Sequence, residues 1–224
     1  MSVLSVQSVS YSYKTKYQTV QVVKDVSCDL SAGTLYALVG KSGSGKTTLL
    51  SLLAGLDTPQ SGDIMVNGQS LREIDVDIYR RKQASVIYQS YNLFPLMTVC
   101  ENVMYPLKLL RHSDADAKKE AQIALEKVGL GESYWKRLPA MLSGGEQQRV
   151  AIARTLAVHA QIVLADEPTG NLDTENSSQI IQLLSKLAHE ETCCVVVVTH
   201  DLEVAKAADV VFRMDSGRIK EDAV

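Results

Sequence analysis

The sequence predicts an α/β fold with a parallel-sheet core, an N-terminal antiparallel β part and an inserted α-helical part. Three observations support this prediction. Short apolar runs alternate with segments of helical spacing, which favours a parallel sheet covered by helices on both faces. The N-terminal segment alternates at period two, as a strand does, whereas the pattern from about residue 92 to 160 is helical. We therefore expect one domain, with 1–90 and 160–224 forming the core and its β part, and 91–159 forming the helical part.

The expected elements follow in an order that fits this fold. Before the helical part, strands are expected at 2–13, 20–30, 34–40, 61–68 and 84–89, with a helix at 46–56. Within it, helices are expected at 98–110, 114–130 and 145–159, and Asp114 is a candidate N-cap. After it, strands at 162–167 and 192–200 alternate with helices at 174–191 and 202–208, and a hairpin follows around Asp215-Ser216-Gly217.

Composition narrows the classes of function. Hydrophobic residues at 46% and charged residues at 22% are typical of a globular domain. The net charge of −3 shows no overall basic excess, so no nucleic acid partner is expected. The apolar runs are far shorter than the roughly 20 residues of a membrane-spanning helix, and no signal peptide is visible. A membrane process would therefore need its membrane part on another chain.

The four cysteines show no metal or redox pattern. They stand at positions 28, 100, 193 and 194, without a C-x-x-C pair or zinc-like spacing. Cys193 and Cys194 begin an apolar run and are expected in the core. This usage favours a reduced, cytosolic compartment.

The segment GKSGSGKT at 40–47 has the pattern of a phosphate-binding loop. Its glycines permit conformations that direct N–H groups at phosphate oxygens, and the following helix adds its positive end. Lys46 is expected to reach the β- and γ-phosphates, and the Thr47 hydroxyl to bind Mg²⁺. A plain Gly/Ser-rich turn is a weak alternative, because a strand and a helix flank the motif. The candidate binding residues here are Gly40, Ser42, Gly43, Ser44, Gly45, Lys46, Thr47 and Thr48.

Polar side chains end three other expected strands. Asp166 and Glu167 follow four apolar residues, and ligands of parallel sheets bind at the carboxyl ends of strands. Asp166 is placed to hold Mg²⁺ through water, and Glu167 to activate a water that attacks the γ-phosphate. His200 ends a neighbouring apolar run, with a capping or core histidine as its alternative. Gln89 ends SVIYQ and could contact both metal and water, although a lone glutamine is not specific.

A second glycine-rich loop, within LSGGEQQR at 142–149, also precedes an expected helix. Ser143, Gly144 and Gly145 offer N–H groups to an anion, and Ser143 with Glu146 has the pattern of a capping box. Because the loop belongs to the helical part, we do not expect it to reach a nucleotide held by its own chain. It could instead reach the γ-phosphate held by a second copy, so that two copies would enclose two ATP molecules.

LSGGEQQRVAIAR resembles the signature of ATP-binding-cassette (ABC) ATPases, and the resemblance covers essentially the whole chain. Residues 40–47 resemble the phosphate loop, 142–146 the signature and 162–167 the metal-binding strand of that family. The fold this implies is a P-loop NTPase (RecA-like) core with an N-terminal antiparallel β subdomain and an inserted helical subdomain. Hereafter, residues 142–146 are called the signature loop.

Single residues match other family positions. Gln89 resembles the Q-loop glutamine, Asn171-Leu172-Asp173 the D-loop, and His200 the switch histidine. Tyr13 resembles the aromatic residue that stacks on adenine, with Tyr11 as the competing candidate and packing within the sheet as the alternative role. By this resemblance, Glu167 is the general base, His200 holds the γ-phosphate, and Asp173 lies across an interface between two copies.

The resemblance also implies partners. An ATP-dependent homodimer would drive a separate membrane permease from the cytoplasmic face of the membrane. The permease would contact the stretch SYNLFPLMTVCENV after Gln89, whose apolar residues otherwise suggest a buried loop. LADEPTGNLD and ENVMYPL resemble most closely a subgroup that includes lipoprotein-releasing, macrolide-exporting and antimicrobial-peptide-resistance ATPases. A cell-division ATPase belongs to the same subgroup and is one alternative. A soluble ABC protein without a permease is the other.

Overall fold

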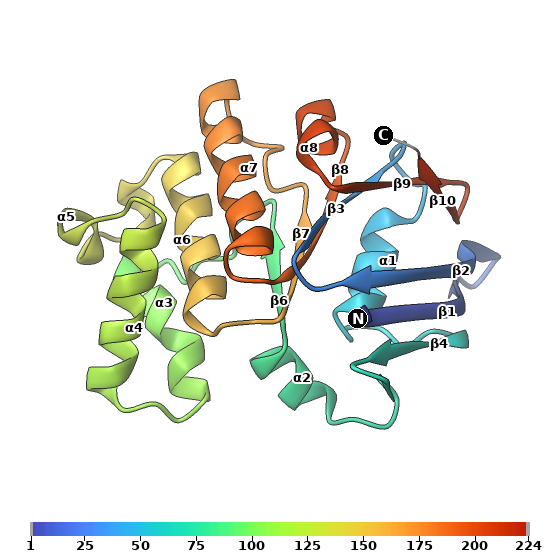
Figure 1. Ribbon diagram of the computed structural model, residues 1–224, viewed down its shortest axis with the longest axis horizontal. Helices are drawn as coiled ribbons and strands as arrows, with labels where there is room; N and C mark the ends of the chain where they lie inside the picture. The colour runs from blue at the N-terminus through green and yellow to red at the C-terminus, as the bar shows by residue number, and fades with distance from the viewer. Residues whose placement is uncertain (1, 223–224) are drawn as a thin grey trace.

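Two β-sheets of different character make up the frame of the molecule (Figure 1). The computed structural model describes residues 2–222. In the smaller sheet all neighbouring strands are antiparallel, as predicted for the N-terminal part. It contains β1 (Ser2–Lys14), β2 (Thr19–Ser31), β4 (Ser61–Val66) and β5 (Gln69–Ser70), in the order β2-β1-β4-β5.

The larger sheet is parallel except for one edge hairpin. Strand β3 lies between β8 and β9 and is parallel to both, while β7 lies between β8 and β6. The last two strands pair antiparallel and confirm the predicted hairpin. The sheet contains β3 (Thr34–Val39), β6 (Ala84–Tyr88), β7 (Ile162–Asp166), β8 (Cys194–Thr199), β9 (Val210–Asp215) and β10 (Arg218–Asp222), in the order β10-β9-β3-β8-β7-β6.

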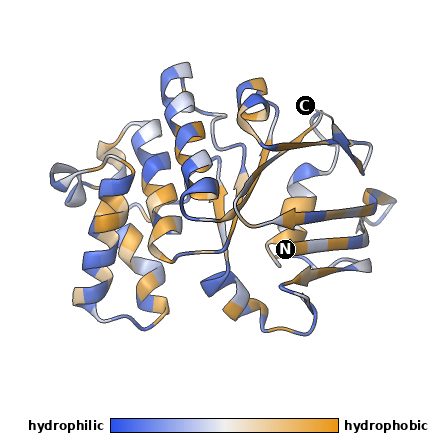
Figure 2. Ribbon diagram, in the orientation of Figure 1, coloured by the Kyte–Doolittle hydropathy of each residue, from blue (hydrophilic) through white to orange (hydrophobic). Residues whose placement is uncertain are grey.

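Hydrophobic cores cover both faces of the parallel sheet. Along β3, Leu35 and Ala37 belong to one core, whereas Tyr36 and Leu38 belong to the other. The second core also takes up helix α1 (Lys46–Leu53), which lies between the two sheets (Figure 1). Apolar residues therefore run continuously along the central strands, while the outer elements alternate between polar and apolar (Figure 2). The α/β class with a two-sided parallel sheet is confirmed.

The other core takes most of its helices from the segment inserted between β6 and β7, together with α7 and α8. Helices α3, α4 and α6 pack on one another, and α6 also contacts α7, which follows β7. The helical elements of this segment are α3 (Val99–Leu109), α4 (Asp114–Lys127), the short α5 (Glu132–Trp135), the 3₁₀ turn η1 (Pro139–Met141) and α6 (Gly144–Ala157). The remaining helices are α2 (Val76–Lys82), α7 (Thr174–His189) and α8 (Leu202–Ala207).

Two helix boundaries differ from the sequence-based expectation. Ser113, not Asp114, is the N-cap of α4, because its extended backbone allows its hydroxyl to accept from the Asp116 amide at 3.1 Å. Asp114 is instead the first helical residue, where a carboxylate interacts favourably with the helix dipole. Helix α1 ends at Leu53, earlier than expected, because the chain turns at Gly55 with a φ of +64°.

Two expectations about the chain as a whole can also be compared with the structure. Among residues 2–222, no helix has the length and apolar character needed to cross a membrane. Cys193 and Cys194 are buried, as expected for core residues. All four cysteines are free.

Candidate functional site

The phosphate-loop motif connects the end of β3 to the start of α1, as its pattern requires. Close backbone neighbours explain two of its glycines. A Cβ atom on Gly40 would lie 2.3 Å from the carbonyl oxygen of Met214, and one on Gly45 would lie 2.3 Å from that of Val22. Gly45 also has a φ of +108°, which disfavours any side chain. The backbones of β9 and β2 therefore pack directly against the loop.

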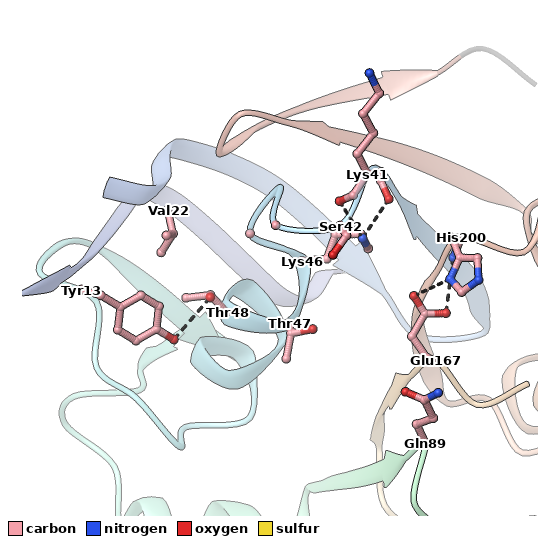
Figure 3. Close-up of a pocket in the computed structure, with 13 residues that line it drawn as sticks. Tyr13, Val22, Lys41, Ser42, Lys46, Thr47, Thr48, Gln89, Glu167 and His200 are labelled. Atoms are coloured by element: carbon pink, nitrogen blue, oxygen red, sulfur yellow. Dashed lines mark hydrogen bonds and ion pairs between the residues drawn. The ribbon is translucent and has the colours of Figure 1, made fainter. Parts of the chain in front are cut away.

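Lys46 lies beneath this loop with its side chain almost fully buried. Its ammonium donates to the carbonyl oxygens of Gly40, at 2.8 Å, and Lys41, at 3.1 Å (Figure 3). The nearby Ser44 hydroxyl is buried and has no hydrogen-bond partner among the described residues. A buried ammonium and an unpartnered hydroxyl at the start of a helix form a site suited to an anion.

A cavity of about 760 Å³ opens in front of the loop, a volume suited to a nucleotide-sized ligand. Its wall brings together most of the residues predicted from the sequence. They are Tyr13, Gly40, Ser42, Gly43, Gly45, Lys46, Thr47, Thr48, Gln89, Glu167 and His200. Val22 and Lys41 complete the wall. Val22 carries no sequence signal for a binding role, because it belongs to an ordinary strand pattern on β2.

Tyr13, and not Tyr11, faces this cavity. The Tyr13 hydroxyl lies 3.4 Å from the Thr48 hydroxyl at the start of α1 (Figure 3). Tyr11 packs edge-to-face against Tyr13, with ring centroids 5.2 Å apart, and its own hydroxyl donates to Asp57 at 3.4 Å. Tyr11 therefore supports the ring of Tyr13, and Tyr13 is the aromatic side chain available to a base.

Asp166 and Thr47 form a pair of possible oxygen ligands for a metal beside the phosphate loop. Asp166 ends β7, and the Thr47 hydroxyl donates to its carboxylate at 3.2 Å. Burial raises the pKa of Asp166, an effect opposed by this hydrogen bond and by the charge of Lys46. A partly buried carboxylate next to a hydroxyl suits Mg²⁺, which takes few protein oxygens and completes its shell with water and phosphate. No cluster of three or more His, Cys, Asp or Glu side chains suited to a metal occurs in residues 2–222.

Glu167 and His200 meet at the ends of neighbouring strands β7 and β8. The carboxylate of Glu167 lies 2.9 Å from Nδ1 of His200 (Figure 3). The Glu167 backbone has a φ of +47°, unusual for a non-glycine residue, and its amide donates to the Val198 carbonyl at 2.9 Å. The His200 side chain is 74% exposed and that of Glu167 only 19%. His200 is therefore not the core histidine of the alternative, and its side chain is open to a ligand.

Gln89 reaches the same cavity from the end of β6 and is tied to the D-loop. Its side-chain amide donates to Asn171 Oδ1 at 3.1 Å, and Asn171 Nδ2 donates back to the Gln89 carbonyl at 3.1 Å. Two residues on, Asp173 is the N-cap of α7 and accepts from the Asn176 amide at 2.8 Å. Hydrogen bonds from Asn176 lower the pKa of Asp173, which is exposed.

The signature loop lies outside the cavity. No residue from 142 to 146 belongs to the cavity wall. Ser143 and Glu146 form the predicted capping box: the Ser143 hydroxyl accepts from the Glu146 amide, and the Glu146 carboxylate accepts from the Ser143 amide at 2.7 Å. Burial raises the pKa of Glu146, but hydrogen bonds from Ser143 and Tyr134 outweigh it and lower the pKa overall. The N–H groups of Gly144 and Gly145, the first two of α6, have no partner within the helix, and Gly145 is buried.

Comparison with known proteins assigns the chain to a family. Residues 23–170 match the family described as ABC transporter. The chain is 40% identical to the uncharacterized ABC transporter ATP-binding protein YclH of Bacillus subtilis, over 97% of this chain and 95% of that protein. It is 41% identical to the lipoprotein-releasing system ATP-binding protein LolD of Chromohalobacter salexigens, over 98% and 94%.

Solved structures agree with this assignment. The dimeric structure of MJ0796, described as a bacterial ABC transporter cassette, superimposes with a TM-score of 0.89 at 35% identity, covering 98% of this chain and 97% of that one. A second dimeric MJ0796 structure, in a post-hydrolysis state bound to ADP and Pi, gives the same values. The chain belongs to the ABC transporter family and is an ATP-binding and ATP-hydrolysing subunit of that family.

Proposed function

We propose that this chain binds MgATP, pairs with a second copy around two ATP molecules, and drives a separate membrane permease. The observation that carries the proposal is the place of the signature loop, whose Ser143 and free N–H groups lie outside the cavity formed by their own chain. These donors can contact a nucleotide held by another copy. The dimeric MJ0796 cassettes are consistent with such pairing. Residues 1–90 with 160–224 would form the nucleotide-binding core, and 91–159 the helical subdomain.

In this proposal different cavity residues bind the base, the phosphates and the metal of MgATP. The Tyr13 ring stacks on the adenine base. Lys46 exchanges the carbonyl oxygens of its own loop for the β- and γ-phosphates, an exchange favoured by the charge of those phosphates. Thr47 and Asp166 hold Mg²⁺, which supplies positive charge to the phosphate oxygens. Gln89 lines the same cavity, and its amide oxygen would serve as a further ligand for the metal or the attacking water.

Catalysis would rest on the pair of residues at the ends of β7 and β8. Glu167 accepts the proton of the attacking water, and His200 contacts the γ-phosphate. The 2.9 Å contact between the two side chains holds the carboxylate in place until a phosphate engages the histidine. The signature loop of the second copy then donates to the same γ-phosphate, and Asp173 lies at the interface between the two copies.

A permease has a suitable docking surface after Gln89. Leu96 is 91% exposed and Phe94 39% exposed, although both are apolar. This exposure argues against the alternative of a buried loop and supports a partner site there. The docking surface is defined here as residues 93–97. Because relatives include lipoprotein-releasing subunits, we propose an export or force-transmitting system for lipoprotein, peptide or antibiotic, with this chain on the cytoplasmic face of the membrane.

Mixing two inactive variants tests whether active sites are shared. Lys46→Ala removes the phosphate-loop cation, and Ser143→Arg fills the signature loop with a large side chain. In a mixed pair, the intact phosphate loop of the Ser143→Arg chain faces the intact signature loop of the Lys46→Ala chain. We expect ATPase activity to appear only on mixing, at up to about half the wild-type rate per mixed pair if the sites act independently.

The control is a chain that carries both substitutions, which cannot complement itself. Light scattering under the same conditions establishes whether the chains associate. If the two variants associate but their mixture remains inactive, each chain contains a complete active site and the proposal of shared sites is wrong. The assignment of the chain to the ABC ATPases would stand in either case.

A further inference from the structure

Glu167 and His200 separate two cavities. Both residues line the cavity in front of the phosphate loop, and both also line a second cavity of about 490 Å³. Among residues 2–222, no other residue lines both cavities. The partition between them is therefore formed by these two residues, whose carboxylate and imidazole lie 2.9 Å apart (Figure 3).

Helix α7 contributes one polar face to the second cavity. Its lining residues recur at positions i, i+3, i+4 and i+7, which a helix brings to the same side. They are Thr174, Ser177, Ser178 and Ile181. Three of these four side chains carry a hydroxyl, which can both donate and accept a hydrogen bond. A cavity with such a face can hold chains of hydrogen-bonded water.

Asp201, the residue after His200, adds a carboxylate to this lining. One of its oxygens accepts from the Glu203 amide at 2.9 Å, and the other accepts from the buried Thr169 hydroxyl at 3.2 Å. Among the residues that the structure describes, no lysine or arginine lines the second cavity. Carboxylates and hydroxyls without a cation attract protons and water but repel phosphate.

The proposed reaction leaves Glu167 with a proton that it must lose. The oxygen of the attacking water bonds to the γ-phosphorus, the bond from that phosphorus to the β–γ bridging oxygen breaks, and its electron pair stays on ADP. One proton of the water goes to Glu167, and the other leaves on hydrogen phosphate. The carboxylate must pass its proton on before the next turnover. A nucleotide in the first cavity and a second copy over it exclude bulk water from that side of Glu167.

We propose that the second cavity is the water path through which Glu167 returns its proton to solvent while nucleotide fills the first cavity. A phosphate that engages His200 draws the imidazole from the carboxylate and so opens the partition. The opening requires only side-chain movement, because the Glu167 amide stays bonded to the Val198 carbonyl. This inference rests on the proposed function, in which Glu167 is the general base. The hydroxyls of α7 then act by holding water and touch neither nucleotide nor metal.

Filling the second cavity tests this path. Ser177→Phe adds a ring to the cavity face of α7, and Gln182→Phe, at an exposed position of the same helix outside the cavity, is the matched control. The first turnover of Ser177→Phe should match wild type, because it begins with an ionised Glu167. We expect its steady-state kcat to fall about tenfold, because each later turnover waits for the proton to leave. Gln182→Phe should retain wild-type kcat.

The timing of proton release is the decisive readout. Quenched flow measures ADP formation, and a pH-indicator dye in weak buffer measures the released proton, at mildly alkaline pH where the phosphate product keeps one proton. In wild type the proton should be released together with ADP formation, whereas in Ser177→Phe its release should be slower by about tenfold. If kcat falls but the proton is still released together with ADP formation, the ring acts in another way and the path is refuted.

Two controls exclude an effect of the ring on binding or pairing. Affinity for a fluorescent ADP analogue should match wild type, because Ser177 does not line the nucleotide cavity. The double variant Glu167→Gln with Ser177→Phe should accumulate as the ATP-bound dimer as fully as Glu167→Gln alone, by light scattering. If Ser177→Phe fails either control, Ser178→Phe fills the same cavity from an exposed position and carries the same expectations.

Failure of this inference can be told apart from failure of the proposed function. Equal kcat and equal timing of proton release in the Ser177 and Gln182 variants would show that the second cavity is not the path. If the Lys46 and Ser143 variants still complement each other in that case, the shared active sites stand and only the present inference is wrong.

Discussion

The His200 imidazole and the Glu167 carboxylate lie 2.9 Å apart, from the ends of two hydrogen-bonded parallel strands. Among residues 2–222, the Glu167 carboxylate contacts only His200, and His200 also lines the cavity. Register explains the proximity: Asp166 is opposite Val198, so the residues that follow on β7 and β8 leave the sheet together. The chemistry proposed for Glu167 can therefore be tested without disturbing the phosphate loop.

The first prediction concerns Glu167→Gln. The amide keeps the size of the side chain but cannot accept a proton from water, so ATP hydrolysis should fall by about 10²-fold or more. ATP binding should persist because Lys46 and Tyr13 are untouched, and the ATP-bound dimer should accumulate. Single-turnover hydrolysis and light scattering at saturating MgATP measure the two effects. Glu203→Gln, an exposed glutamate on α8, is the control. A monomeric Glu167→Gln protein under these conditions would contradict the proposed dimer.

The second prediction concerns Asp166→Asn and the pH dependence of stability. Burial raises the pKa of Asp166 above its ordinary value of 3.8, so the folded protein binds this proton more tightly than the unfolded chain. Stability from this residue is therefore lost as pH rises through the window between the unfolded and folded pKa values. At pH 7 the ionised carboxylate destabilises the ligand-free protein, and Asp166→Asn should raise its Tm.

Thermal unfolding between pH 4 and 8 checks this sign. The gain in Tm for Asp166→Asn should be largest at neutral pH and shrink as the pH approaches 4, where Asp166 is increasingly protonated. The same variant should lose the extra stabilisation that MgATP gives over ATP without magnesium. A gain in Tm that does not change with pH would show that the charge of Asp166 is not its cause.

The features that sequence analysis predicted are those with a local cause. Strand β8 is predicted from a run of consecutive apolar residues. The phosphate loop before Lys46 is predicted from the spacing of its glycines. The capping box of Ser143 and Glu146 is equally local and is confirmed. The short β5 and α5 have too few residues to show a periodicity, so the sequence does not predict them.

The features that were missed depend on tertiary contacts. Asn171 pairs with Gln89 across 82 positions of sequence, so neither residue signals the other. Val22 enters the cavity wall because the pairing of β1 with β2 shifts register between Tyr11 and Ser12, which alternation alone cannot reveal. Ser113 could have been found locally, since Ser and Asp both favour the N-cap and only backbone geometry decides between neighbours.

The third prediction concerns the docking surface. Leu96→Glu places a charge on a side chain that is 91% exposed, so the Tm of the isolated protein should match wild type and its ATPase rate should stay within about twofold of wild type. Binding to the permease should fall by at least about tenfold because an apolar contact is replaced by a buried charge. Co-purification with the membrane protein encoded by the neighbouring reading frame measures it.

Leu202→Glu is the matched control for this experiment. Leu202 is 72% exposed on α8, away from residues 93–97. It should retain permease binding if the docking surface is where we propose. Equal binding of the Leu96 and Leu202 variants would show that residues 93–97 do not receive the permease.

The fourth prediction concerns Asn102, whose side chain forms hydrogen bonds with the backbone of the docking surface. The side chain is fully buried on α3, and its amide donates to the carbonyl oxygens of Phe94, Met97 and Thr98 at 3.0–3.1 Å. Its oxygen accepts from the Phe94 amide at 2.7 Å. One buried amide thus ties together backbone groups on both sides of Leu96, and Asn102→Ala removes its bonds to the Phe94 amide and the Met97 carbonyl. The carbonyl oxygens of Phe94 and Thr98 keep bonds from the Met97 and Asn102 amides.

We expect Asn102→Ala to lower the free energy of unfolding by about 2–4 kcal/mol, since several buried hydrogen bonds are lost at once. Urea unfolding measures this, with Lys119→Ala, an exposed position on α4, as a control that should change stability by less than about 0.5 kcal/mol. Permease binding should fall along with stability, because Phe94 and Leu96 lose their fixed backbone. ATP affinity should persist at temperatures where the variant is folded, because Asn102 does not line the cavity. Wild-type stability in Asn102→Ala would mean that the loop finds other partners and that the exposed position of Leu96 does not depend on α3.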